Sequence, residues 1–501
     1  MNLVRTPKGS ATGRSPRPGA ALAALAAAQF TVMLATSIVN VALPQIRAGT
    51  GLSDGAVTWV VNAYGLAFGA LLPAGGRAAD LLGRRRVLIA GVGLFAAASL
   101  AAGLAATPEV LITARALQGL AAAAIAPAAL ALALAQDPSG PGRGRALGVW
   151  GAVSGAGGAG GVLLGGVLTE AWGWSWIFHA VALGSALVLA AVVALVPADA
   201  GPAADRGSGR FDLAGTLTVT LALTCLVWGL TTARSEGWGD GRVVGALAAA
   251  VALLVAFAVI ERRRPNALIP PRLLTTGRVA TGNLLMALLG SVWIALFFFL
   301  PLYQQQVLGS GPLATGASQL PLAGANMLGA SLAPRIARRF GATTTAAAAL
   351  LTEAAGLLWL SRIGAEGSYA TDVLGPSLLI GLGLGTAFVQ LTALAVEGVP
   401  PRDAGLAGGL VNTTRQVGGA IGLAVLTTLA GSVTAHAAVH GSHPEALTAG
   451  YRAAFAVSAA VLTATALLAP LLVRCTGGKA VAAAAPSLPD HREPRVGRTA
   501  A

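Results

Sequence analysis

Fourteen stretches of this chain are apolar over a length that can cross a lipid bilayer, and this feature limits the possible fold more than any other. A hydrocarbon core of about 30 Å needs a helix of about 20 mostly apolar residues. The sequence therefore predicts an all-α polytopic membrane protein with 14 transmembrane helices. The expected spans are residues 20–43, 56–75, 87–106, 110–135, 147–168, 177–196, 212–232, 243–260, 280–300, 313–333, 342–360, 373–396, 405–430 and 452–473.

The positions of the basic residues predict how these spans are oriented. The chain holds 33 Lys and Arg and is only 10% charged overall. With the N-terminus in the cytoplasm, 26 of them fall in cytoplasmic segments, 5 in external loops, and Arg115 and Arg415 within spans. This bias is the positive-inside rule. We therefore expect a multi-pass protein of the cell (inner or plasma) membrane with both termini cytoplasmic. Because the basic residues are dispersed over short loops, no nucleic-acid partner is expected.

A repeated charged pattern divides the chain into two related halves. The run Gly76–Arg86 follows the second span, and Ala330–Arg339 follows the tenth with Pro334 in place of Asp80. Two six-helix bundles separated by two extra helices, a 6+2+6 arrangement, are the simplest explanation. The expected divisions are a cytoplasmic N-terminal tail (1–19), an N-terminal bundle (20–197), a linker with the two extra helices (198–278), a C-terminal bundle (279–474) and a disordered cytoplasmic tail (475–501).

The first of these charged runs is expected to be a short loop, and it carries the most specific motif. Gly76, Asp80, Gly83, Arg84 and Arg85 occur there in an order that resembles the signature loop of the major facilitator superfamily. Glycines permit a tight turn, Asp80 can accept hydrogen bonds from a neighbouring helix, and the arginines can pair with acids of the other half. Such contacts would hold one conformation of a carrier. The alternative is a basic cytoplasmic anchor with an incidental acid.

Two further motifs lie within the fourth and fifth spans. Arg115 and Gln118 form an Arg-x-x-Gln-Gly pattern that resembles a second signature of this superfamily, in which the arginine is linked to proton coupling; snorkelling to an interface is the alternative. The glycine-dense fifth span resembles the antiporter signature, although Val162 stands where the family has proline. Ordinary packing of small residues is the alternative there. Its motif glycines are Gly157, Gly161, Gly165 and Gly166.

Motifs along nearly the whole chain resemble the fourteen-helix drug:proton antiporters of the superfamily. They are Leu34–Pro44, Trp59–Tyr64, Trp174–Phe178, Leu300–Gln305 and Asn412–Gly419. The resemblance implies the major facilitator fold, with two pseudo-symmetric six-helix bundles. It also implies proton-coupled export of amphipathic drugs or antibiotics by alternating access, which confers resistance or self-resistance.

The same resemblance indicates which partners the protein has. It implies a small-molecule substrate, protons and the lipid bilayer as partners, and a chain that functions as a monomer. No enzymatic activity, cofactor or metal is expected. Transport of another metabolite, such as a lipid or siderophore, in either direction remains an alternative. A non-transporting membrane sensor is a further alternative, although no sizeable soluble signalling domain supports it.

One departure from the family changes which residues are candidates for binding the proton. The family often has an acid where Ala35 stands, and alanine cannot titrate. Either the proton site has moved, or the substrate is neutral or anionic. Glu353 is the acid that lies deep within a span, so Glu353 and Arg115 are the proton-coupling candidates. An acid that is hydrogen-bonded inside the bundle, without a transport role, is the alternative for Glu353.

Other polar side chains in or beside the spans are candidates for lining a substrate cavity. Hydrogen bonding between helices is the alternative role for each of them. They are Asn40, Asn62, Tyr64, Gln118, Gln304, Asn412, Arg415 and Gln416. Asp212, at the start of the seventh span, is expected to cap that helix.

Overall fold

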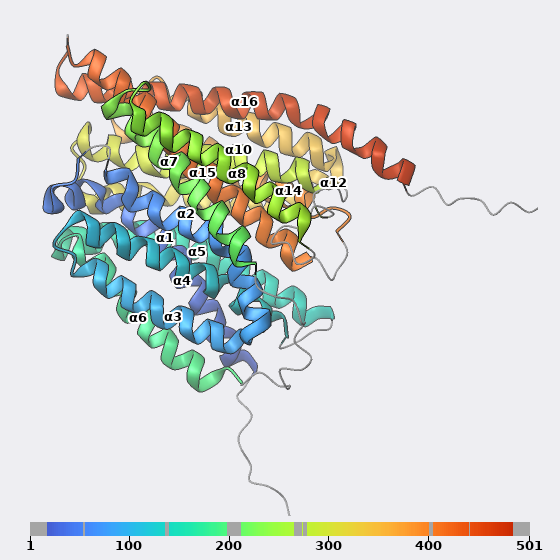
Figure 1. Ribbon diagram of the computed structural model, residues 1–501. Coiled ribbons are helices and arrows are strands. Elements are labelled where there is room, and N and C mark those ends of the chain that lie inside the picture. Colours follow the sequence, from blue (N-terminus) through green and yellow to red (C-terminus); the bar gives the residue numbers. More distant parts are fainter. Residues whose placement is uncertain are drawn as a thin grey trace, which may run out of the picture.

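The structure, a computed structural model, describes residues 18–53, 56–135, 140–197, 212–264, 273, 278–399, 404–439 and 441–483. All regular elements in these ranges are helices (Figure 1). The fourteen long helices are α1 (Pro18–Thr50), α2 (Val57–Leu82), α3 (Arg84–Gly103), α4 (Pro108–Ala135), α5 (Gly140–Trp172), α6 (Ser175–Leu195), α7 (Leu213–Glu236), α8 (Gly241–Arg263), α10 (Val279–Gln306), α12 (Leu320–Phe340), α13 (Ala342–Leu360), α14 (Leu374–Ala395), α15 (Ala404–Ala437) and α16 (His443–Ala483). Two short helices complete them, α11 (Pro312–Ser318) and the π-helical turn η2 (Tyr369–Val373).

Thirteen of the long helices in the described ranges are long and apolar enough to cross a membrane. The fourteenth, α12, is less apolar because Arg335, Arg338 and Arg339 belong to its last turns. The predicted tenth span, 313–333, is divided into α11 and α12. Pro321 explains the division, since its ring opposes an unbroken helix through the preceding turn.

The two charged runs are mostly helical, which corrects the expectation of a loop at Gly76–Arg86. Helix α2 continues through the run to Leu82, and only Gly83 separates it from α3. Gly83 has φ 101°, a conformation that L side chains rarely adopt. In the second half Gly341, with φ 84°, separates α12 from α13 in the same way. The repeat seen in sequence is thus a repeated glycine break between adjacent helices.

Each half packs its six helices in the same pattern. In the first half α1 packs on α5, α2 on α4, and α3 on both α4 and α6. In the second half the equivalent contacts join α10 to α15, α12 to α14, and α13 to α14 and α16. Figure 1 shows the first six helices, blue to cyan, on one side and the last six, yellow to red, on the other. The fold is therefore two pseudo-symmetric six-helix bundles.

The bundles meet along two seams. One seam joins α2 to α15, and its pseudo-symmetric counterpart joins α5 to α11 and, less extensively, to α12. We call the end of the molecule where α1 begins the tail end, and the end where α10 terminates the far end. Apolar side chains from both halves form one continuous core cluster.

The two extra helices lie beside the bundles. Helix α7 covers the α2–α15 seam, because Leu223 and Val227 pack against Leu66 of α2 and Ala420 of α15. Helix α8 packs on α7 and buries few of its apolar side chains, Val243 and Ala250 among them. Figure 1 shows both helices, in green, across the front of the molecule.

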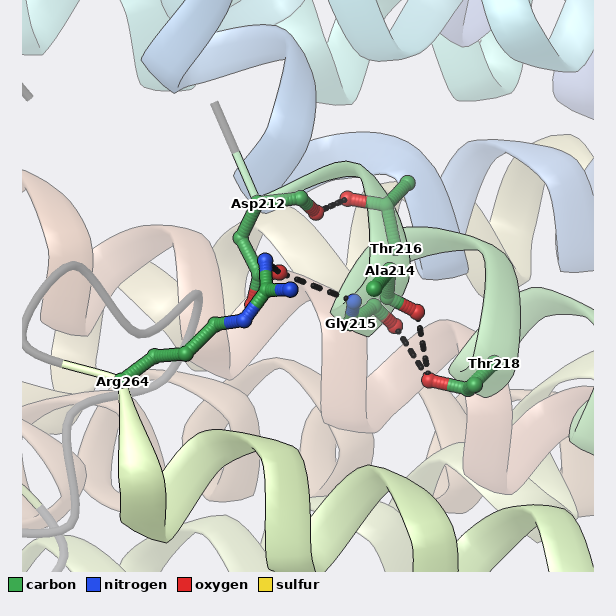
Figure 2. Close-up of polar contacts among 6 residues, drawn as sticks. All are labelled: Asp212, Ala214, Gly215, Thr216, Thr218 and Arg264. Carbon is green, nitrogen blue, oxygen red and sulfur yellow. Dashed lines mark hydrogen bonds and ion pairs between the residues drawn. The ribbon is translucent and has the colours of Figure 1, made fainter. Parts of the chain in front are cut away.

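Asp212 holds the tail end of this helix pair, as Figure 2 shows. Its carboxylate accepts a hydrogen bond from the Gly215 backbone amide at 3.0 Å, so the predicted helix cap is confirmed. The same carboxylate forms an ion pair of 2.7 Å with Arg264, which follows α8. Asp212 therefore caps α7 and ties it to α8.

The C-terminal segment is more helical than the sequence predicted. Helix α16 continues to Ala483, nine residues into the segment 475–501 for which disorder was predicted. Alanine has the highest helix propensity, and the segment is alanine-rich at this point. Residues 1–17 and 484–501 lie outside the described residues.

Candidate functional site

Arg115 of α4 lies at the centre of a buried polar network in the first half. Its side chain is 1% exposed. Nε donates to the carbonyl of Val60 in α2 at 2.8 Å, and Nη1 donates to the carbonyl of Ala35 in α1 at 3.3 Å. A third bond, of 2.9 Å, joins Nη1 to Gln118 Oε1. The guanidinium group thus ties three helices together through oxygen atoms that carry no formal charge.

Tyr64 of α2 completes this network from the other side. Its ring centroid lies 4.5 Å from the Arg115 guanidinium carbon, a cation–π contact. The tyrosine hydroxyl donates to the carbonyl of Val32 at 3.1 Å and accepts from Thr36 at 3.2 Å. Three of the predicted residues, Arg115, Tyr64 and Gln118, are therefore brought together.

Gln118 extends the network outward to α3. Its amide nitrogen donates to the Ser99 hydroxyl at 2.7 Å, and Ser99 in turn donates to the carbonyl of Phe95 at 2.6 Å. This chain connects α4 to α3, on the side away from α1 and α2. In this structure Gln118 bonds only within the first half, among the residues described.

Arg415 of α15 occupies the second half and differs from Arg115 in its contacts. Its guanidinium carbon lies 5.0 Å from the ring centroid of Trp293 in α10. Trp293 in turn meets the ring of Phe388 in α14 edge to face, with centroids 5.4 Å apart. Neither aromatic residue could be selected from the sequence, because an aromatic residue that faces the protein interior cannot be told there from one that faces lipid.

Gln416, next to Arg415, faces the opposite half. A Cβ atom built on Gly69 of α2 would lie 2.6 Å from Gln416 Cβ, so the two helices touch at this point. Gln416 Oε1 and both amide atoms of Asn62 in α2 are buried without a hydrogen-bond partner among the described residues. Unpaired buried amides are costly in apolar surroundings, and they mark the α2–α15 seam as a polar region inside the membrane.

The remaining cavity candidates lie apart from this network. Gln304 is near the far end, where its Oε1 accepts from Ser318 at 2.9 Å. Asn412 donates to the Gly408 carbonyl of its own helix at 3.3 Å. Asn40 of α1 is buried, and its Oδ1 has no partner among the described residues.

Glu353 lies in a different part of the second half. It is fully buried in α13, and neither carboxyl oxygen has a hydrogen-bond partner among the described residues. A Cβ on Gly383 of α14 would lie 2.6 Å from the Glu353 backbone nitrogen, so α14 passes directly over this position. Glu353 and Arg115 are therefore in separate halves, and the structure places no contact between them.

The four motif glycines of α5 serve two different contacts. Gly157, Gly161 and Gly165 face α1; a Cβ on Gly161, for example, would lie 2.7 Å from the carbonyl oxygen of Leu34. Gly166 faces α11 of the other half, where a Cβ would lie 3.1 Å from Leu313 Cα. Three glycines thus bring α5 close to its own bundle, and the fourth brings it close to the opposite bundle.

The charged residues around the junction of α2 and α3 form contacts within the first half. Asp80 and Arg84 form an exposed ion pair of 3.2 Å. Arg85 donates to the carbonyls of Val193 and Val196, both at 2.8 Å, at the end of α6. A cation at a helix C-terminus satisfies free carbonyls and the helix dipole. Gly76, in the last turns of α2, lies beside Pro127 of α4.

At the far end, two hydrogen bonds between described residues join the halves. Glu170, near the end of α5, accepts from the backbone amide of Leu313 in α11 at 2.8 Å. Gln305 of α10 donates to the carbonyl of Val41 in α1 at 2.8 Å. Glu170 was not among the residues predicted from the sequence. Its only signal was an acid at the end of a glycine-dense helix.

Two similar bundles that are hydrogen-bonded to each other at the far end, with buried polar side chains inside, define a class of protein. The arrangement is that of a secondary membrane transporter, in which two repeats move against each other around a site near the middle of the bilayer. A sequence model described as the Major Facilitator Superfamily matches residues 25–423. The chain belongs to this superfamily, and it is a membrane transporter rather than an enzyme.

Two relatives match this chain over nearly its whole length, and a third matches it over most of its length. The puromycin resistance protein of Streptomyces alboniger is 40% identical, covering 94% of this chain and 95% of that protein. The cephamycin export protein of Amycolatopsis lactamdurans is 40% identical, covering 92% of this chain and 95% of that protein. The tetracenomycin C resistance and export protein of Streptomyces glaucescens is 35% identical, covering 84% of this chain and 78% of that protein.

Solved structures share the fold at low sequence identity. An auto-inhibited peptide transporter of the POT family has a TM-score of 0.67 at 17% identity, covering 91% of this chain and 96% of its own. A bacterial homologue of the lysosomal transporter Spinster has a TM-score of 0.63 at 16% identity, covering 93% of this chain and 99% of its own.

Proposed function

We propose that this protein is a proton-coupled exporter of amphipathic drugs or antibiotics. The observation that carries the proposal is 40% identity, over nearly the full length, to two proteins named for puromycin resistance and cephamycin export. Membership of a transporter superfamily supplies the mechanism, in which the two halves rock about a central site. One chain is the transport unit, because both bundles and both seams belong to it.

The protein is placed by this proposal in the plasma membrane, with both termini and the tail end facing the cytoplasm. The distribution of Lys and Arg supports that orientation. The two hydrogen bonds at the far end, from Leu313 to Glu170 and from Gln305 to Val41, then close the outer side. A bonded outer side suits the stage at which an exporter loads its substrate from the cytoplasm, and these two bonds support assigning the structure to that stage.

The charged run at the junction of α2 and α3, Gly76–Arg86, is the proposed switch for the opposite state. Asp80 and Arg84 are exposed and paired with each other at the tail end. When the far end opens, the tail ends of the halves approach, and these groups can then pair across the seam. Their present pairing keeps both groups within one half, as the proposal expects while the far end is closed.

Proton movement supplies the driving force in this proposal. One inward proton gains about 2.3 kcal/mol at a potential of 100 mV, and a pH gradient adds to it. Protons and substrate act by favouring different states of the carrier. Glu353 and Arg115 are the proposed coupling residues, and they lie in opposite halves whose relative positions change during transport.

Inside-out vesicles from cells that lack other efflux pumps test this proposal. We expect uptake of an amphipathic dye or antibiotic only when the vesicle interior is acid, and its collapse when a protonophore is added. Vesicles that contain the empty vector provide the control. Uptake in whole cells but none in inverted vesicles would show an importer instead. Absence of transport under both conditions would favour the sensor.

A further inference from the structure

The middle of the molecule holds two arginines that no acid balances. Arg115 lies in the first half and Arg415 in the second. Among the described residues neither guanidinium pairs with a carboxylate, and Ala35 stands beside Arg115 where an acid would balance it. Glu353, the acid within a span, is on α13 and packs against α14. The fixed charge at the centre is therefore positive.

The two arginines differ in how completely the protein satisfies them. Arg115 is enclosed, with three hydrogen bonds and the ring of Tyr64 against it, and its Nη2 is the guanidinium nitrogen without a partner among the described residues. Arg415 is only half-buried and makes no hydrogen bond among the described residues. Its Nε atom is buried without a partner. Arg115 is therefore part of the framework, whereas Arg415 has donors available for a ligand.

The surroundings of Arg415 add an apolar surface to this charge. Trp293 lies against the guanidinium at 5.0 Å, and Phe388 meets Trp293 edge to face. Charged groups inside a membrane normally have a partner or face a water-filled cavity. A guanidinium presents a planar fork of donors that matches a carboxylate or sulfonate. The aromatic pair can pack against the apolar body that carries such a group.

We propose that Arg415, Trp293 and Phe388 form a binding site for the anionic group of an amphipathic substrate. This deepens the proposed function, on which it rests, by naming the substrate class as an organic anion. A carboxylate or sulfonate on an aromatic or polycyclic body provides the missing counter-charge of Arg415. A cationic amphiphile meets two uncompensated arginines and is disfavoured.

Binding of two related dyes to the purified full-length protein tests the proposal. Fluorescein carries negative charge and rhodamine 6G carries positive charge on the same xanthene body, and fluorescence anisotropy measures the affinity of each. We expect fluorescein to bind more tightly. Replacing Arg415→Gln removes the charged donors and weakens fluorescein binding by about tenfold or more, whereas Arg415→Lys retains part of the affinity.

A matched control is available at the surface. Arg339 lies over the ring of Phe340 at 5.4 Å, so Arg339→Gln makes the same chemical change against an aromatic ring outside the proposed site. It is expected to leave both affinities unchanged. Size-exclusion profiles of all variants confirm that each remains folded.

The outcomes separate this inference from the function on which it rests. Tighter binding of rhodamine 6G, or fluorescein binding that Arg415→Gln leaves unchanged, overturns the anion site. Uptake of cationic but not anionic dyes by inverted vesicles would also overturn the anion site, but it would support the proposed export function. If fluorescein binding depends on Arg415 but no dye is transported, the anion site is supported and the proposed export function is refuted.

Discussion

At the scale of single residues, Arg115 shows why an arginine can stabilise a membrane interior without an acid partner. Its guanidinium donates to carbonyls of Val60 and Ala35 and stacks on Tyr64, so one side chain connects three helices. Such carbonyls already accept bonds within their helices and have a second lone pair available. The arginine therefore uses acceptors that any helix provides.

The substitution Arg115→Lys tests this role. Lysine retains the charge but lacks the planar fork, so the bonds to Val60 and Ala35 cannot both be kept. We expect unfolding in mixed micelles to become easier by about 2 kcal/mol. Arg452→Lys is the control, since Arg452 donates to the carbonyl of Ser361 at 3.0 Å from an exposed position. Equal losses in the two variants would refute a special role for Arg115.

Glu353 is the residue whose role in proton coupling is most open to measurement. It is fully buried in α13, and its carboxyl oxygens have no partner among the described residues. The substitution Glu353→Gln preserves the volume and removes the exchangeable acid. We expect substrate-induced proton release from the purified protein to be lost. The same change at exposed Glu366 serves as the control, and unchanged proton release in Glu353→Gln would contradict the coupling role.

The sequence indicated which polar residues lie inside the membrane more reliably than it indicated their partners. Arg115 and Gln118 were predicted from one motif, because polar residues are rare within spans. The carbonyl partners of Arg115 could not be predicted, since they depend on how α1 and α2 are rotated about their axes. Arg415 was recognised for the same reason as Arg115, but its contact with Trp293 joins α15 to α10, which are far apart in sequence.

At the scale of helices, the close packing of α5 on α1 depends on glycine. A Cβ atom on Gly161 would lie 2.7 Å from the carbonyl oxygen of Leu34, which is closer than real Cβ atoms approach. Side chains at such a position force the helices apart. The glycine-dense motif of the fifth span is thus explained by helix contact, whatever further role it has in transport.

Gly161→Ala is expected to destabilise the protein by about 1–3 kcal/mol, the usual cost of overpacking. Thermal unfolding of the purified protein measures the loss. Gly158→Ala in the same helix is a strict control, because a Cβ there has no neighbour within 4 Å. Alanine also favours helix over glycine, so this control should keep or slightly raise the unfolding temperature. A similar loss in both variants would exclude the contact as the cause.

Helix number and helix boundaries were not equally predictable. Fourteen apolar segments predicted fourteen long helices, and the structure contains them within its described ranges. Hydropathy could not reveal that α2 continues through Gly76 to Leu82, because a charged segment can be a loop or the end of a helix. It also could not reveal the division at Pro321, since apolar composition continues across it.

At the scale of the whole molecule, the two pseudo-symmetric seams differ in whether an extra helix covers them. Helix α7 covers the seam between α2 and α15, and no extra helix of the described chain covers the seam between α5 and α12. The sequence predicted a 6+2+6 order of helices. It could not predict that α7 covers the α2–α15 seam, because that position depends on tertiary contacts with helices far away in the chain. Asp212 and Arg264 then hold α7 and α8 as one unit.

Alternating access requires the far end to open during each transport cycle. In this structure α5 and α11 meet there, with Glu170 bonded to the Leu313 amide and Gly166 against the same segment. Both Glu170 and Leu313 have exposed side chains, so cysteines at these positions can react with a short bismaleimide. The starting protein carries serine at Cys225 and Cys475.

Export by the cross-linked carrier is the most direct test of the account. Dye uptake into inverted vesicles is measured for the double-cysteine protein before and after bismaleimide treatment, with both single-cysteine proteins treated in parallel. The account predicts that linking α5 to α11 stops export, whereas the singly modified proteins retain it. Export by the linked carrier at the rate of the unlinked one would contradict the opening of the far end and, with it, transport by rocking halves.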